Sequence, residues 1–233
     1  SMSEVRTIRV DRNINACNDT AAGAVRRMMN ENGTLFLNIM SAPGSGKTTL
    51  LTALINRLKP EFRIGEMDVD ICSSLDARRV ADQTGIPSLQ IHNGGLCHID
   101  ADMTLRALLE YDSSDLDVLF LENIGNLVCP AEFDTGAHRN IALLSIPEGD
   151  DKPLKYPLMF EVCDAVIITK TDVRAYFDFD LKKAMDAIHR LNPDTHIFTV
   201  SARTGEGLDI LCDYIRELYS AEGPSRKRIQ TPL

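Results

Sequence analysis

A glycine-rich segment with a lysine and two threonines, Ser41-Ala-Pro-Gly-Ser-Gly-Lys-Thr-Thr49, joins an apolar run to a helical stretch. Its inner glycines let successive backbone N–H groups face one anion, and the next helix adds its positive end. The pattern predicts a phosphate site in which Lys47 reaches the β- and γ-phosphates and the Thr48 hydroxyl binds Mg²⁺. The alternative, a chance glycine-rich turn, would need neither the preceding strand nor the Gly-Lys-Thr-Thr sequence. The candidate nucleotide-binding residues here are Gly44, Ser45, Gly46, Lys47, Thr48 and Thr49.

A second set of candidate residues follows the apolar run 118–122. Glu122, at the end of that run, could hold Mg²⁺ through a water molecule, although most GTPases have aspartate there. The amide of Gly125 could meet the γ-phosphate, so both join Lys47 and Thr48 as candidate catalytic residues. Asn126 follows Gly125 where a glutamine would orient the attacking water. Because its amide is shorter, we expect slow turnover.

A third set, Thr169-Lys-Thr-Asp172, predicts the base that the nucleotide carries. Asp172 could accept hydrogen bonds from both guanine N–H groups, while the stem of Lys170 covers the ring. Many GTPases have asparagine where Thr169 stands. The pair Ser201-Ala202 ends a later strand and resembles the loop that backs guanine. Asp172 alone could be a helix-capping acid, but these sets, in this order at strand ends, predict GTP rather than ATP.

Two cysteines and a histidine could bind a transition metal. Cys97 and His98 follow one predicted strand, and Cys129 follows the strand that ends at Glu122. Because parallel strands open at the same edge, the three side chains could converge near the nucleotide. Thiolate and imidazole suit Zn²⁺ or Ni²⁺, with an open position or a site shared across a two-fold axis. The alternative is that cysteine is a small buried hydrophobe. We assign that role to Cys17, Cys72, Cys163 and Cys212.

The elements that must position these residues alternate along the chain. Short apolar runs predict strands at 34–40, 62–67, 88–92, 118–122, 165–169 and 196–200. Amphipathic stretches predict helices at 21–29, 47–58, 75–84, 99–111, 181–191 and 208–219. This alternation predicts an α/β fold, with a mainly parallel sheet and helices on both faces.

The stretch from Pro130 to Pro157, rich in charge, glycine and proline, predicts a long irregular loop of functional importance. Its Lys152 and Lys155 could reach the phosphates or acids of a second copy, so we expect a GTP-favoured homodimer; a solvated loop is the alternative. Residues 1–221 are expected to form a single P-loop domain, and residues 222–233 a flexible tail.

Composition limits the classes of function. The 233 residues are 44 % hydrophobic and 25 % charged, which is typical of a soluble globular chain. The 25 lysines and arginines against 34 acids give a net charge of −9, which argues against nucleic-acid or anionic-membrane binding. No apolar run approaches the roughly 20 residues of a spanning helix. The first residues show no secretory pattern, so we expect a cytoplasmic protein with reduced thiols.

Several longer motifs resemble one known family. They are the Ser41–Thr49 loop, Gly95-Leu-Cys-His-Ile-Asp-Ala-Asp-Met103, Glu122-Asn-Ile-Gly-Asn-Leu-Val-Cys-Pro130, Glu148-Gly-Asp-Asp-Lys-Pro-Leu-Lys-Tyr-Pro157 and Lys170-Thr-Asp172. Over roughly residues 20–220 the chain is similar to the hydrogenase-maturation nickel-incorporation GTPases, the HypB family. The resemblance implies a P-loop NTPase fold of the signal-recognition/MinD type and a slow GTPase that converts GTP to GDP and phosphate.

The resemblance also implies ligands and partners. It implies a Ni²⁺ or Zn²⁺ site at Cys97, His98 and Cys129, and Asp70 as the acid near Mg²⁺ beside Thr48, with Asp68 as a competitor. The implied function is a metallochaperone that assists nickel insertion into a [NiFe] hydrogenase large-subunit precursor, together with other maturation proteins. The alternatives are a urease-accessory-type nickel GTPase, whose Cys-Pro-His motif is absent here, a nucleotide-regulated metal carrier with incidental hydrolysis, and a small-molecule kinase.

Overall fold

The computed structural model describes residues 5–13, 16–70 and 75–222. Their strands form one sheet in the order β1-β4-β3-β5-β2-β6-β7-β8, and each neighbouring pair is parallel. The strands are β1 (Val5–Arg9), β2 (Leu35–Ser41), β3 (Ile64–Val69), β4 (Ser88–His92), β5 (Val118–Glu122), β6 (Arg139–Ser145), β7 (Ala165–Thr169) and β8 (His196–Thr199). The sheet thus has the predicted parallel α/β architecture.

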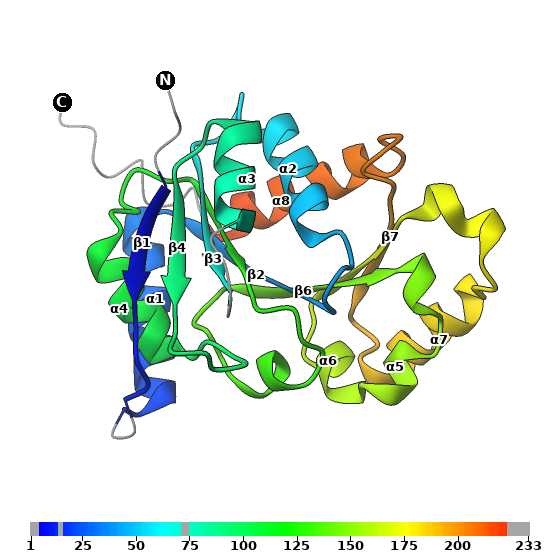
Figure 1. The fold of residues 1–233 in the computed structure, drawn as a ribbon, viewed down its shortest axis with the longest axis horizontal. Helices are drawn as coiled ribbons and strands as arrows, with labels where there is room; N and C mark the ends of the chain where they lie inside the picture. The colour runs from blue at the N-terminus through cyan, green and yellow to red at the C-terminus, as the bar shows by residue number, and fades with distance from the viewer. Residues whose placement is uncertain (1–4, 14–15, 71–74, 223–233) are drawn as a thin grey trace.

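Helices cover both faces of this sheet (Figure 1). The helices are α1 (Asn18–Asn32), α2 (Lys47–Leu58), α3 (Leu75–Thr84), α4 (Ala101–Glu110), α5 (Lys152–Lys155), α6 (Pro157–Glu161), α7 (Leu181–Leu191) and α8 (Leu208–Glu222). Helices α2, α3 and α8 lie on one face, and the other helices lie on the opposite face. Among the described residues, none of the helices is both long and apolar enough to cross a membrane.

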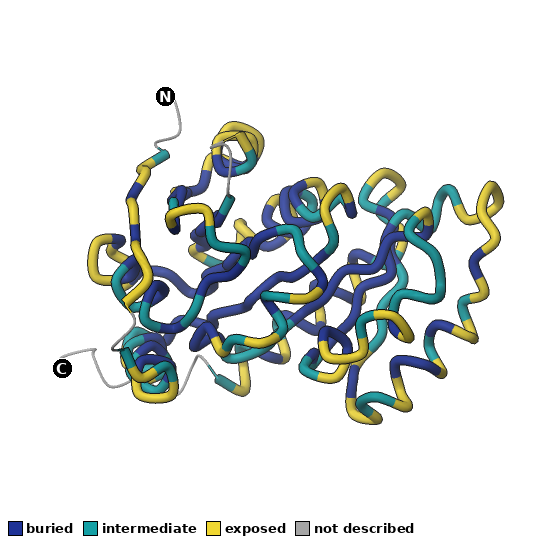
Figure 2. The backbone as a smooth tube through the Cα atoms, turned by 60° about the horizontal axis from the view of Figure 1, so that its bottom comes forward, coloured by how far each residue is buried: buried dark blue, intermediate teal, exposed yellow. Residues whose placement is uncertain are grey.

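The core lies in layers on either side of the sheet. Along β2, Leu35 and Leu37 pack with α2 and α8, while Phe36 packs with the layer that contains α1 and α4. All seven residues of β2 are buried, which is expected of a parallel strand covered on both faces. Figure 2 shows the central strands as buried, with exposed residues gathered on the helices and loops.

Two strands were absent from the sequence prediction. The stretch Pro130–Pro157 is not an irregular loop, because it contains β6, which pairs with both β2 and β7, as well as helix α5. Its apolar run is only four residues long, between Asn140 and Ser145, so the local pattern did not reveal a strand buried inside the sheet. Strand β1 lies at the sheet edge, and three of its five residues are exposed, so it gives little apolar signal.

Helix α8 continues through Glu222, which was expected to begin the tail, and the Glu222 carboxylate lies 3.0 Å from Arg139. Residues 223–233, expected to be a flexible tail, lie outside the described residues, as does Cys72.

Candidate nucleotide and metal sites

A cavity of about 780 Å³ opens at the carboxyl ends of β2, β3, β5 and β7. The chain leaves β2 toward β3 on one side of the sheet and later passes from β5 to β6 on the other side. Such a reversal of strand order is where open parallel sheets bind ligands. The cavity is lined by the Ser41–Thr49 loop, by residues after the other strands and by residues of α3.

The loop has the backbone that an anion site requires. Gly44 and Gly46 have φ values of 73° and 85°, a left-handed conformation that glycine adopts without strain. Gly46 is also the N-cap of α2, and no side chain caps the first amides of that helix. Those amides therefore remain available to a phosphate group at the positive end of α2.

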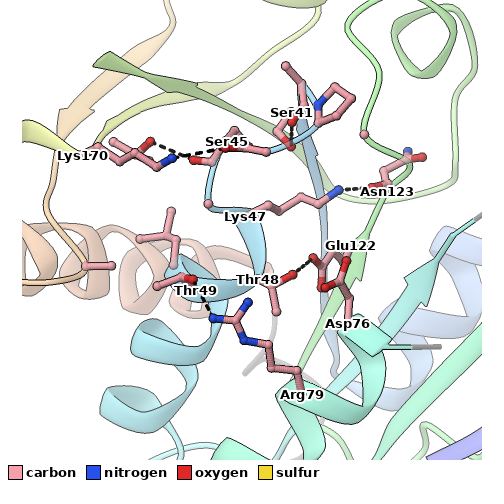
Figure 3. A pocket seen from close by; sticks show the side chains of 18 of the residues that line it. Ser41, Ser45, Lys47, Thr48, Thr49, Asp76, Arg79, Glu122, Asn123 and Lys170 are labelled. Atoms are coloured by element: carbon pink, nitrogen blue, oxygen red, sulfur yellow. Dashed lines mark hydrogen bonds between the residues drawn. The ribbon is translucent and has the colours of Figure 1, made fainter. Parts of the chain in front are cut away.

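Lys47 and Thr48 connect the loop to the end of β5, as Figure 3 shows. The Lys47 ammonium donates to the carbonyl of Asn123. The Thr48 hydroxyl donates to Oε1 of Glu122 over 2.5 Å. Gly125 approaches the loop so closely that an added Cβ would lie 3.2 Å from Cα of Pro43. The residues predicted to meet the β- and γ-phosphates therefore gather at one end of the cavity.

Three buried carboxylates lie beneath this end. Glu66, Asp68 and Glu122 each offer an oxygen within 4.8 Å of the others, and both oxygens of Glu66 have no hydrogen-bond partner. Oδ2 of Asp68 and Oε2 of Glu122 also lack one. Burial is the main cause that raises the pKa of Glu66, and burial followed by the charge of Glu122 raises the pKa of Asp68 to about 9.

Unpaired carboxylate oxygens beside a threonine hydroxyl fit Mg²⁺, whose protein ligands are oxygens. Asp70, which the resemblance implied as the acid near Mg²⁺, lines the cavity, but Asp68 lines it too and is the one clustered with Glu122. Sequence reasoning missed Glu66, since an acid within a strand gives no local sign of the acids on the next strand.

The buried acid predicts a pH dependence of stability. An aspartate in the unfolded chain titrates near pH 3.9, so between about pH 4 and pH 9 the folded state retains a proton on Asp68 that the unfolded state has lost. The free energy of unfolding of the nucleotide- and Mg²⁺-free protein should therefore fall as pH rises through this window. Thermal melting between pH 6 and pH 9 measures the slope.

Asp68→Asn should reduce that slope, because the amide does not titrate. The matched control is Asp115→Asn, which alters a side chain that is 91 % exposed and should leave the slope unchanged. An unaltered slope in Asp68→Asn would assign the dependence to other groups.

The other end of the cavity holds the residues predicted to bind guanine. Lys170 has a φ of 60°, which among the described residues is the one positive value outside glycine, and such strain is typical of functional sites. Its Nζ donates to the carbonyl of Gly44 over 3.2 Å. Asp172 accepts a hydrogen bond from the Ser201 hydroxyl over 2.9 Å. Ala202 lines the cavity, whereas Ser201 is buried behind Asp172 and orients its carboxylate.

The predicted metal ligands are only partly brought together. Cys97 and Cys129 lie close enough that the Cys97 thiol is the main cause that raises the pKa of Cys129. His98 is buried and stacks on Phe133, with ring centroids 3.8 Å apart and planes 9° from parallel. Within the described part of the chain, these three side chains do not form a group whose ligand atoms all lie within 4.8 Å.

The stack joins the two metal-ligand segments. Phe133 is the C-cap of the short 3-10 turn η1 (Cys129–Glu132), so one turn carries both a thiol and the ring that holds His98. Burial is the main cause that lowers the pKa of His98, which keeps the imidazole in the neutral form that binds metals. Contact between two loops leaves no sequence pattern, so the role of Phe133 was not predicted.

Of the cysteines assigned to the core, Cys163 and Cys212 are buried as predicted. Burial raises the pKa of both thiols, so they are poor ligands. Cys17 is exposed, so its assignment to the core was wrong; it is the N-cap of α1, at the surface.

Comparison with known proteins places this arrangement in a family. Residues 35–199 match the family model described as CobW/HypB/UreG, nucleotide-binding domain. The hydrogenase maturation factor HypB of Azotobacter vinelandii is 42 % identical over 207 residues, which are 89 % of this chain and 68 % of that protein. The chain belongs to the HypB family. The hydrogenase/urease maturation factor HypB of Helicobacter hepaticus is 40 % identical and covers 91 % of this chain and 88 % of its own length.

Solved structures of HypB proteins share the fold. HypB from Archaeoglobus fulgidus superposes with a TM-score of 0.80 at 36 % identity, covering 87 % of this chain and 98 % of that one. HypB from Helicobacter pylori in complex with nickel gives 0.81 at 37 % identity, covering 89 % and 98 %. The signal recognition particle receptor FtsY from Elizabethkingia anophelis, with a TM-score of 0.51 at 14 % identity, shares the fold alone, which confirms the predicted fold class. As a member of the HypB family, the chain is a P-loop NTPase, a class of proteins that bind and hydrolyse nucleoside triphosphates.

Proposed function

We propose that this chain is a GTP-hydrolysing metallochaperone that assists nickel insertion into a [NiFe] hydrogenase precursor. One observation carries the proposal: a single cavity holds a phosphate end built on Lys47 and a base end built on Asp172, and the Cys129 thiol follows four residues after Gly125. The relatives named hydrogenase maturation factor HypB support a hydrogenase precursor as the client, and the nickel complex of the H. pylori relative supports nickel as the cargo.

Phosphoryl transfer asks the protein mainly for positioning and charge stabilisation. The amides at the start of α2 would hold the phosphate oxygens, and Lys47 would leave the Asn123 carbonyl to neutralise charge that develops on the γ-phosphate. Mg²⁺, when bound at Thr48 with Asp68 or Asp70 and with Glu122, would neutralise further phosphate charge. The Gly125 amide would face the γ-phosphate from the end of β5.

The structure supports the expectation of slow turnover. Asn126 donates its N–H to the carbonyl of Ser41 over 2.9 Å. Its side-chain oxygen accepts from the N–H groups of Val128 and Cys129, at 2.7 and 3.1 Å. This side chain is therefore occupied in holding a turn and is not directed to an attacking water.

Nickel would enter as cargo, on the side chains that follow β4 and β5. Cys97 and Cys129 supply two neighbouring thiols, which favour Ni²⁺ or Zn²⁺ once deprotonated. His98 would supply a third ligand after it moves away from Phe133. Two thiols per chain are half of a closed tetrahedral site, which supports a homodimer that shares the metal. The proposed compartment is the cytoplasm, where such thiols stay reduced.

Loss of the Cys129 thiol should weaken Ni²⁺ binding by about 100-fold or more, since changes even to outer-shell partners cost 10–100-fold. Titration of Ni²⁺ and Zn²⁺ into wild type and Cys129→Ala measures the affinity and stoichiometry. Cys212→Ala is the matched control, because it removes a buried thiol on α8 and should bind nickel as wild type does. Unchanged affinity and stoichiometry in Cys129→Ala would exclude this residue from the site.

The decisive experiment for the function is phosphate release from GTP and from ATP, each with and without Ni²⁺. A GTPase metallochaperone should prefer GTP, and a carrier with incidental hydrolysis should bind nickel but gain nothing from turnover. Molecular mass with a non-hydrolysable GTP analogue tests the dimer. In this structure Lys155 lies 2.9 Å from Asp151 of its own chain, so it would have to exchange this exposed ion pair for a contact with a partner.

A further inference from the structure

Arg79 extends from α3 toward the first turn of α2, at the edge of the nucleotide cavity (Figure 3). Its Nη2 donates to the hydroxyl of Thr49 over 3.3 Å. Ala77 and Val80 of the same helix are buried, and Val80 fixes α3 against the core. Arg79 is thus held beside the helix start whose amides would face the phosphates, yet no nucleotide motif of the sequence includes it.

The partners of Arg79 differ from those of the other cations that line the cavity. Lys47 and Lys170 donate to backbone carbonyls, and Arg203 faces the carboxylate of Asp172 at 3.9 Å. Within the described residues, Arg79 contacts a neutral hydroxyl and makes no ion pair. A guanidinium has five N–H donors, so Arg79, which lines the cavity, keeps donors available to an anion bound there.

The order of residues in the cavity indicates which part of the nucleotide Arg79 meets. Lys47 and Glu122 mark the γ-phosphate end, and Lys170 marks the base end. Thr49 follows Thr48 in the first turn of α2, and Figure 3 shows Thr49 on the far side of Thr48 from Glu122, away from the γ-phosphate end. We propose that Arg79 binds the α-phosphate of the nucleotide and so ties α3 to GDP and GTP alike. This inference rests on the nucleotide-binding part of the proposed function only.

The test is the affinity of wild type, Arg79→Ala and Arg79→Lys for GTP, GDP, GMP and guanosine. Charge-assisted hydrogen bonds are stronger than neutral ones, so Arg79→Ala should weaken the binding of GTP, GDP and GMP alike, by about tenfold or more. Guanosine, which has no phosphate, should bind unchanged. Arg79→Lys should fall between wild type and alanine, because it keeps the charge and loses the fork. Arg78→Ala is the matched control, since Arg78 is exposed, adjacent and outside the cavity lining.

Three results would overturn the proposal. Unchanged phosphate-dependent affinities would show that Arg79 does not contact the nucleotide. Weakening of GTP alone would place the arginine at the γ-phosphate, and an equal loss with guanosine would assign it a structural role. Failure of guanine specificity is a separate outcome, because the same series with ATP, ADP, AMP and adenosine would still test the α-phosphate contact.

Discussion

Lys47→Ala is expected to lower phosphate release from GTP by at least about 10³-fold, because the variant loses the ammonium that offsets charge on the γ-phosphate. The loop itself should survive, since its shape rests on Gly44 and Gly46 and alanine is a good residue in the first turn of a helix. Phosphate release under single-turnover conditions, with thermal melting to verify the fold, measures the effect.

Lys59→Ala provides the control for charge and position. Lys59 caps the opposite end of α2 and donates to the carbonyl of Thr84 over 2.9 Å, far from the phosphate end. This variant should hydrolyse GTP at the wild-type rate. Unaltered turnover in a well-folded Lys47→Ala would place the phosphate site elsewhere.

The second large effect is expected at the base end. Asp172→Asn should weaken the binding of guanine nucleotides by about 100-fold. The reason is that a carboxylate that accepts from two N–H groups becomes an amide that offers one donor and one acceptor. ATP binding should not change. Xanthosine triphosphate, which carries a carbonyl in place of the exocyclic amine of guanine, should regain affinity in the variant.

Ser201→Ala gives a graded companion, since it removes the 2.9 Å hydrogen bond that orients Asp172 and leaves the carboxylate in place. Its loss of GTP affinity should be smaller than that of Asp172→Asn. If Asp172→Asn bound GTP as tightly as wild type and did not favour xanthosine triphosphate, the guanine assignment would have to be abandoned.

Local pattern was sufficient to predict much of the fold. Helices α2, α3 and α7 and strands β4, β5 and β7 have the predicted bounds. These elements have strong periodicity or unbroken apolar runs, and α2, β5 and β7 also lie next to motifs whose chemistry fixes where they begin or end. The cavity lining likewise includes the predicted loop, Asp70, Gly125 and Asp172.

The features that escaped prediction all depend on contacts between distant segments. Strand β6 is buried because β2 and β7 flank it, which its own short apolar run does not reveal. Glu66 joins Glu122 only because β3 pairs with β5. Phe133 meets His98 only because the loops after β4 and β5 leave the sheet at the same edge. Such juxtapositions follow from strand order, which the sequence pattern left open.

The turn held by Asn126 has a mechanical consequence. Asn126 donates its backbone N–H to the carbonyl of Ser41, and its side chain accepts from the N–H of Cys129. The segment between the phosphate loop and the thiol is therefore short and hydrogen-bonded at both ends. A movement at either end of such a segment displaces the other end. If Gly125 moves away from Pro43 when phosphate leaves, the Cys129 thiol must move with it, and a metal bound at Cys129 would oppose that movement. By reciprocity, a bound metal would then change the affinity for the nucleotide by the same free energy by which the nucleotide changes the affinity for the metal.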